Sequence, residues 1–121
     1  ALIFIRSGST WTEESTIMAS DIASYTAFGT SVSINSNGSI VGIGAASATI
    51  GAFSGAGAAY IFSRSGSTWS QSAKVNASNR QTNDYFGNSI AIDNSGTFLL
   101  VGNPYSDPGS VGNAGAAYIF S

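Results

Sequence analysis

Few side chains in this sequence could carry out catalytic chemistry. Histidine and cysteine are both absent from the 121 residues, so the chain offers neither an imidazole base nor a thiol nucleophile. Lys74 is the only lysine, and its alternation with Val75 and Ala77 is typical of a solvated lysine on a strand. Glu13 and Glu14 are the one adjacent pair of acids, and neighbours on a strand point to opposite faces instead of converging as glycosidase carboxylates do. We therefore expect a solvated sheet edge at these two residues, and we expect a protein that is not an enzyme.

Other polar residues are candidates for binding or modification. The segment 103–109 contains both prolines and one acid, which predicts a rigid connector. As an alternative, Tyr105 and Asp107 of this segment would contact a glycan or a protein. Asn37 and Asn76 each begin an Asn-X-Ser pattern for N-glycosylation, and Asn37 lies at the tip of a predicted turn.

The composition excludes some partners and favours others. Charged residues make up 8 % of the chain and the formal net charge is −2, so no basic patch is present to bind nucleic acid. No apolar run is long enough to span a bilayer, so we expect no membrane insertion. Surface polarity must come from serine, threonine, asparagine and glycine, a composition common in secreted and cell-surface β-proteins. We therefore expect an extracellular or cell-surface location.

A gapless internal repeat organises the chain. Residues 7–11 recur unchanged as residues 65–69, and residues 57–63 recur as residues 115–121. All equivalent positions are 58 residues apart. Each unit is predicted to contain four short strands, because residues alternate with a period of two and glycine-containing turns separate the segments. The predicted strands are residues 31–34, 39–44, 58–63 and 69–77, and in the second copy residues 89–92, 97–102 and 116–121.

These strands predict an all-β fold of tandem, four-stranded, antiparallel sheets of the propeller-blade kind. A single sheet of this kind has two apolar faces, and it buries them only by packing against neighbouring sheets. Further copies of the same repeat or of the same protein are therefore the expected partners.

Two short motifs recur in each unit: a Phe-Gly pair at Phe28-Gly29 and Phe86-Gly87, and a triplet that begins with glycine at residues 44–46 and 102–104. In this order inside a tandem repeat, they resemble the Phe-Gly and Gly-Ala-Pro halves of the FG-GAP repeat, the blade of integrin-α-type β-propellers. The resemblance implies that residues 1–27 are the last two strands of one blade, 28–85 a complete blade with its linker, and 86–121 the first three strands of the next. It also implies about two blades of a larger propeller or assembly.

Many members of the family it resembles carry an acid-rich calcium loop, which raises the question of a cation site. The corresponding turns are residues 35–38, which contain no carboxylate, and residues 93–96, which contain one. An ordinary β-turn is the favoured interpretation, and a calcium site at Asp93 and Ser95 is the alternative. No other cofactor is expected.

Aromatic residues at repeat-equivalent positions predict packing between blades rather than stacking on a sugar. The favoured function is thus a non-enzymatic structural or adhesive module that contacts partners or sister subunits through its rim loops. Two alternatives stay open: a carbohydrate- or protein-binding propeller of the integrin or lectin type, and a fragment of a propeller hydrolase with its catalytic residues elsewhere. The predicted packing residues are Trp11, Trp69, Phe28, Phe86, Phe62 and Phe120.

Overall fold

The computed structural model describes all of residues 1–121, and it contains nine β-strands and no helix. The strands form three antiparallel sheets, of two, four and three strands, and each sheet follows the order of the sequence. The prediction of an all-β fold is confirmed. The strands are β1 (Leu2–Ser7) and β2 (Thr10–Thr16) in the first sheet, β3 (Phe28–Ile34), β4 (Ile40–Ala45), β5 (Ala58–Ser65) and β6 (Thr68–Val75) in the middle sheet, and β7 (Ser89–Ile92), β8 (Leu99–Asn103) and β9 (Ala116–Phe120) in the third sheet.

The predicted strands lie close to the observed ones, with β3 as the main difference. The prediction began this strand at residue 31, whereas β3 begins at Phe28. Phe28 pairs with Ala45, and an irregularity separates this pair from the next one, Ser31 with Gly44. A bulge of this kind interrupts the alternation of side chains, so the sequence pattern identifies only the regular part of the strand.

The turns that join the first two strands of each unit have the left-handed glycine that the sequence predicts. Gly38 has a φ of 69° and Gly96 a φ of 80°, a conformation that costs other residues free energy because of their Cβ atom. Before each glycine, a side-chain oxygen of Asn35 or Asp93 accepts hydrogen bonds from the backbone of the turn. The two turns are therefore built in the same way by different residues.

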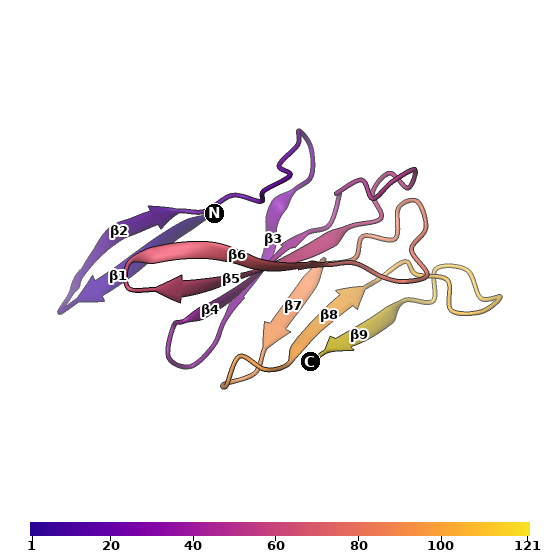
Figure 1. The fold of residues 1–121 in the computed structure, drawn as a ribbon. Helices are drawn as coiled ribbons and strands as arrows, with labels where there is room; N and C mark the ends of the chain where they lie inside the picture. Colours follow the sequence, from indigo (N-terminus) through magenta and orange to yellow (C-terminus); the bar gives the residue numbers. More distant parts are fainter.

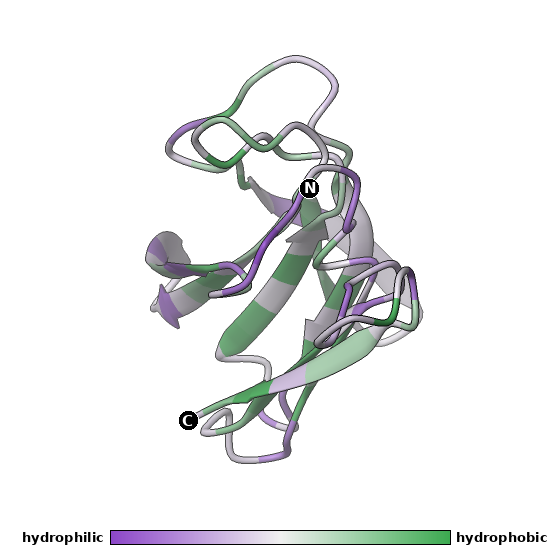
Figure 2. Cartoon of the chain, turned by 90° about the vertical axis from the view of Figure 1, so that its right-hand side faces the viewer, coloured by the Kyte–Doolittle hydropathy of each residue, from purple (hydrophilic) through white to green (hydrophobic).

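The three sheets lie beside one another in chain order, with the middle sheet between the other two (Figure 1). Hydrophobic residues, drawn in green, alternate with less hydrophobic residues along the strands, as expected for sheets with two distinct faces (Figure 2). Two buried clusters hold the sheets together. The first cluster lies between the segment after β2 and the middle sheet, and the second lies between the middle and third sheets. The first includes Ile17, Ala19, Val41, Ile43, Tyr60 and Phe62, and the second consists of Ala59, Ala77, Phe86, Leu99 and Val101.

The middle sheet alone has a neighbouring sheet on each face, and each outer sheet has one on a single face. In the first sheet, Leu2 and Trp11 are 55 % and 63 % exposed. In the third sheet, Ile119 is 73 % exposed. The chain has no helix of the length and apolarity needed to cross a lipid bilayer.

Candidate functional site

The phenylalanine of each Phe-Gly pair packs against two aromatic rings of the third strand in its own unit. This strand is β5 for Phe28 and β9 for Phe86. The Phe28 ring centroid lies 5.5 Å from that of Tyr60 and 6.2 Å from that of Phe62, with the rings nearly perpendicular. Edge-to-face pairs of this kind add stability beyond the apolar area that they bury. The group is repeated in the third sheet, at centroid distances of 5.4 and 6.0 Å, by Phe86 with Tyr118 and Phe120.

Glycines allow the middle and third sheets to approach closely. A Cβ atom on Gly44 would lie 2.0 Å from the carbonyl oxygen of Gly87, so no larger residue fits between these backbones without a shift. The Ser31 hydroxyl donates a hydrogen bond of 2.7 Å to the same carbonyl. The backbone N–H of Ile92 donates to Oγ of Ser33 at 3.0 Å. These contacts join two sheets that belong to different repeats.

The two tryptophans have different environments. Trp69 packs against the first apolar cluster, and its indole N–H donates to Oε2 of Glu14 at 3.2 Å. Glu14 also forms an ion pair with Arg64, and its side chain is only 7 % exposed. The prediction of a solvated edge is therefore wrong for Glu14, because β2 lies against the middle sheet at this point; Glu13 is exposed. The predicted packing does not extend to Trp11, which has no sheet beside it at the equivalent position among residues 1–121 and is 63 % exposed.

A second polar contact links the segment after β2 to the middle sheet. Lys74 lies on strand β6 as predicted and is partly solvated, with its side chain 28 % exposed, but it also forms an ion pair of 2.5 Å with Asp21 that the sequence does not predict. The Tyr60 hydroxyl donates to the same carboxylate at 3.0 Å. At the equivalent positions of the next repeat, the Tyr118 hydroxyl donates to Oδ1 of Asn79 at 2.5 Å. The tyrosine contact is thus repeated, whereas the ion pair occurs once.

Ionisation within this group follows from its contacts. The hydrogen bond from Lys74 holds the pKa of Asp21 below its usual range, against the opposing effect of burial. Burial raises the pKa of the Tyr60 hydroxyl, and the hydrogen bond to Asp21 adds to the effect. Burial tends to lower the pKa of Lys74, but the hydrogen bond to Asp21 and the nearby Tyr60 outweigh it, so this pKa is raised. The three groups therefore favour an anionic aspartate beside a cationic lysine.

A comparison with family models identifies the repeat. The FG-GAP repeat model matches residues 11–62 and again residues 69–120. The chain belongs to the FG-GAP repeat family. The two matches are offset by the spacing of the internal repeat, which confirms the tandem organisation. FG-GAP repeats are found in integrin-like propeller proteins. No curated protein matches the chain in a sequence search.

In the second FG-GAP repeat, the turn considered for calcium uses its carboxylate internally. The Asp93 carboxylate accepts hydrogen bonds from the Ser95 hydroxyl, from the Ser95 N–H at 3.1 Å and from the Phe98 N–H at 2.7 Å. The Ser95 hydroxyl and then the Phe98 N–H lower the pKa of Asp93 to about 2. Asn35 accepts comparable backbone bonds in the first repeat without a charge. The carboxylate therefore has a structural role in closing this turn.

The two glycosylation patterns lie in different surroundings. Asn37 is exposed at its turn, and its Oδ1 accepts bonds from the Ser39 N–H at 3.0 Å and the Ser39 hydroxyl at 2.6 Å. Asn76 is partly buried at the end of β6, and its Oδ1 accepts a bond of 3.2 Å from Arg80. Of the two, Asn37 has the more accessible position for a modifying enzyme.

The loop between β8 and β9 contributes Tyr105 to an aromatic pair with Tyr85 of the loop between β6 and β7. Tyr105 is 50 % exposed, and its ring centroid lies 5.7 Å from that of Tyr85 in an edge-to-face arrangement. Asp107 accepts a bond of 2.5 Å from the backbone N–H of Asn113, so it fixes the shape of the loop. Tyr105 and Asp107 therefore belong to one loop but have different contacts: one side chain is presented to solvent and the other holds the backbone.

A strained backbone in two loops and an unpaired buried amide in β8 are features that the sequence patterns do not predict. The residues three and one positions before each Phe-Gly pair adopt positive φ angles without being glycine, at Tyr25, Ala27, Asn83 and Tyr85. Backbone strain of this kind typically costs about 1 kcal/mol or more per residue. Asn103 is buried with both side-chain amide atoms unpaired. Among the residues with positive φ only the asparagine favours this conformation, so residue type does not predict the strained positions in general.

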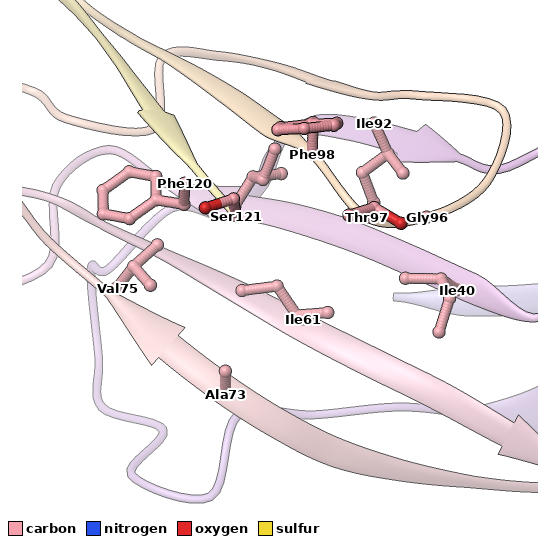
Figure 3. Close-up of a pocket in the computed structure, with 11 residues that line it drawn as sticks. Ile40, Ile61, Ala73, Val75, Ile92, Gly96, Thr97, Phe98, Phe120 and Ser121 are labelled. Atoms are coloured by element: carbon pink, nitrogen blue, oxygen red, sulfur yellow. The ribbon is translucent and has the colours of Figure 1, made fainter.

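An apolar cleft of about 280 Å³ lies between the middle and third sheets, beside the edge of β9 (Figure 3). Ile61, Ala73 and Val75 line it on the middle sheet. Phe98 and Phe120 line it on the third sheet. The third sheet has no strand equivalent to β6, and the cleft opens at the edge where such a strand would pair with β9.

Proposed function

We propose that the chain is a non-enzymatic structural and adhesive module of an extracellular β-propeller. In this proposal each sheet is one blade, and blades stack through their faces while the rim loops contact partners or sister subunits. For each sheet, the front face is the side directed toward the preceding sheet in the chain, and the back face is the side directed toward the following one.

The observation that carries the proposal is the different burial of equivalent residues on the back faces. Ile61 of the middle sheet is half-buried against the third sheet, whereas its equivalent in the third sheet, Ile119, is 73 % exposed. Gly42 is buried, whereas its equivalent, Leu100, is 45 % exposed. An apolar face that is covered within the chain and open at its end supports stacking on a further sheet of the same kind.

The lack of catalytic groups supports a non-enzymatic role. Lys74 is held in an ion pair, and the Asp93 carboxylate closes a turn, so neither is a free acid or base in a cavity. Low charge and the abundance of hydroxyl side chains support the extracellular location. Loops 45–55 and 103–113 are the surfaces proposed to meet partners.

Measurement of molar mass over a range of concentrations tests the stacking proposal. Size-exclusion chromatography with light scattering should show species larger than the 12.2 kDa chain as concentration rises. Ile119→Ser should weaken this association because it removes an exposed apolar side chain from the third sheet's back face. A wild-type chain that stays monomeric at all concentrations would contradict the proposal.

A second function, binding of a carbohydrate or protein, is supported by the exposed ring of Tyr105, which packs edge-to-face on the partly buried Tyr85. Exposed aromatic rings can stack on the apolar face of a sugar, and tyrosine is common in binding surfaces. On a glycan array, Tyr105→Ala should abolish binding, whereas Asp107→Asn should preserve it because an amide oxygen can still accept the Asn113 N–H. Equal binding by wild type and Tyr105→Ala would remove this loop from consideration.

A further inference from the structure

The turn between β3 and β4 contains the one asparagine of the chain that is followed by glycine, in the pair Asn37-Gly38. An asparagine side chain can react with the backbone nitrogen of the next residue, and a glycine leaves that nitrogen unhindered because it has no Cβ atom. Asn37 is exposed at this turn, so water reaches the reacting groups. The residue types, their order and their exposure therefore favour a spontaneous modification at this position.

The side-chain carbonyl of Asn37 is held by two donors of one residue. Its Oδ1 accepts hydrogen bonds from the Ser39 N–H at 3.0 Å and from the Ser39 hydroxyl at 2.6 Å. The bond from the Ser39 N–H closes a small ring of the Asx-turn kind. This ring contains Cγ of Asn37 and the backbone nitrogen of Gly38, so it holds the carbon to be attacked close to the attacking nitrogen.

The two Ser39 donors also lie where negative charge develops when this carbonyl is attacked. Addition of a nucleophile to Cγ of Asn37 converts the planar amide into a tetrahedral intermediate with its charge on Oδ1. Donors that already point at such an oxygen stabilise the charge, as in the oxyanion holes of acyl-transfer enzymes. Ser39 supplies this kind of stabilisation with one backbone donor and one side-chain donor.

We propose that Asn37 is a site of spontaneous deamidation and that Ser39 stabilises the oxyanion of the reaction. The backbone nitrogen of Gly38 forms a bond to Cγ of Asn37 and gives up its proton, the Cγ–Nδ2 bond breaks, and Nδ2 leaves as ammonia. The product is a cyclic succinimide. Water then opens the ring at one of its two carbonyls and gives either aspartate or isoaspartate, without any oxidation or reduction.

One contact of the turn opposes the reaction. The Gly38 N–H donates to the Asn35 carbonyl at 3.1 Å, and this bond must break before the nitrogen can attack. The bonds between Asn37 and Ser39 join residues that are close in sequence, so they can persist while the Gly38 bond is broken. The reaction therefore requires a local opening of the turn and not an unfolding of the sheet.

The equivalent turn of the next repeat has the same backbone but lacks the reactive amide. Ser95 stands in the position of Asn37, and Thr97 stands in the position of Ser39. The glycines of the two turns have φ angles of 69° and 80°, and each glycine N–H donates to the carbonyl three residues earlier at 3.1 Å. The second turn is therefore a matched internal control for the first.

Deamidation of Asn37 changes both a contact between sheets and the glycosylation pattern. The hydroxyl and the N–H of Ser36 both donate to the carbonyl of Asn94, at 2.8 and 3.3 Å, and these bonds join the two turns. Isoaspartate adds a methylene group to the backbone directly after Ser36, so it shifts the turn that makes this contact. The reaction also removes Nδ2, the atom to which an N-glycan is attached, so a deamidated chain can no longer be glycosylated at this position.

Peptide mapping by mass spectrometry, after incubation of the full chain in weakly alkaline buffer, tests the proposal. Conversion of Asn37 to aspartate and isoaspartate should be about tenfold faster than that of any other asparagine, because Asn37 alone precedes a glycine. Ser39→Ala should slow this conversion by about fivefold, the rate equivalent of one hydrogen bond. Ser39→Thr, which copies Thr97 of the second turn, should restore the wild-type rate.

Two further measurements separate the folded turn from the local sequence. Ser95→Asn places an asparagine before the glycine of the second turn, where Thr97 supplies the hydroxyl, and position 95 should then react at a rate similar to that of Asn37. In urea above the unfolding transition, Ser39→Ala should react as fast as the wild type, because the Asx-turn is lost. The proposal is overturned if Asn37 reacts no faster than the other asparagines, if Ser39→Ala leaves the rate in native buffer unchanged, or if its effect is equally large in urea.

Discussion

The middle sheet and the third sheet place similar residues at equivalent positions, but the middle sheet has a neighbour on each face and the third sheet has one. Ala59 is fully buried, whereas Ala117, its equivalent, is exposed. Phe28 and Phe86 differ in the opposite direction: Phe86 is fully buried between two sheets and Phe28 only partly. In a repeat protein, burial thus depends on which neighbouring sheet is present as much as on the residue itself.

The comparison also separates the contacts that form within one sheet from the contacts that join a sheet to the next one. The aromatic group around Phe28 or Phe86 is present in both repeats. The close approach of Gly44 to Gly87 occurs only where one sheet faces another. Matched substitutions at equivalent positions can therefore measure the energetic contribution of a neighbouring sheet.

The largest difference is expected for the Phe-Gly phenylalanines. Phe86→Ala should lower the free energy of unfolding by about 4 kcal/mol, because it leaves a cavity among fully buried groups. Phe28→Ala should cost about 2 kcal/mol, because its ring is already partly accessible. Urea unfolding of the two variants at one protein concentration measures the difference. Equal losses would indicate that the third sheet does not bury Phe86 in solution.

The next effect concerns Gly44 and its equivalent Gly102. Gly44→Ala should lower the free energy of unfolding by about 3 kcal/mol, since the new methyl group meets the backbone carbonyl of Gly87. Gly102→Ala meets only the hydroxyl of Ser89, a side chain that can rotate, and should cost about 1 kcal/mol. The same unfolding assay applies, and a larger loss for Gly102→Ala would contradict the close packing of the two sheets.

Local patterns predicted much of this fold from the sequence. The 58-residue spacing, the turn glycines and the period-two alternation predicted the tandem repeat and the order of the strands, and the Phe-Gly pairs carried the resemblance to the FG-GAP family. These features are local, since a turn or a strand is defined by neighbouring residues. The strand that begins at Phe28 was predicted too short, because its bulge is fixed by pairing with β4.

The side chains of the candidate site were harder to predict because their environment comes from distant residues. Glu14 meets Arg64 and Trp69, and Lys74 meets Asp21, across 50 or more residues of sequence. A strand pattern gives the face on which a residue lies but not the group that it faces. Trp11 and Trp69 illustrate this point, because each ends an identical segment of five residues, yet Trp11 is exposed and Trp69 is partly buried.

These tryptophans provide a third comparison. Trp69→Ala should lower the free energy of unfolding by about 2 kcal/mol, because Trp69 packs on the first apolar cluster and its loss leaves Glu14 with one fewer donor. Trp11→Ala should change it by no more than about 0.5 kcal/mol in the monomer, as is usual for exposed side chains. Denaturant titration at a concentration where the chain is monomeric gives both values. A large loss for Trp11→Ala would mean that a neighbour covers this residue in solution.

The smallest effect, and the one with a distinct pH signature, concerns Asp21 and its equivalent Asn79. The folded-state pKa of Asp21 lies below its value of 3.8 in the unfolded chain, so its contribution is present above pH 3.8 and is lost as the pH falls through the folded-state pKa. Asp21→Asn keeps an acceptor for Tyr60, as Asn79 does for Tyr118, but loses the ion pair with Lys74. It should cost less than about 1 kcal/mol at pH 7, because the carboxylate is half exposed, and the cost should shrink as the pH falls through the folded-state pKa.

The converse substitution, Asn79→Asp, tests whether the lysine or the tyrosine is responsible for the pH-dependent contribution of the aspartate to stability. The third sheet contains no partner equivalent to Lys74, so an aspartate at position 79 gains only the bond from Tyr118. The aspartate of Asn79→Asp should therefore not raise the free energy of unfolding between pH 2 and pH 7, in contrast to Asp21 in the wild type. Urea unfolding at both pH values compares them. A stability difference between Asp21→Asn and wild type that is the same at both pH values would show that the ion pair with Lys74 does not contribute to stability, which would leave the Tyr60 hydrogen bond as the contribution of Asp21.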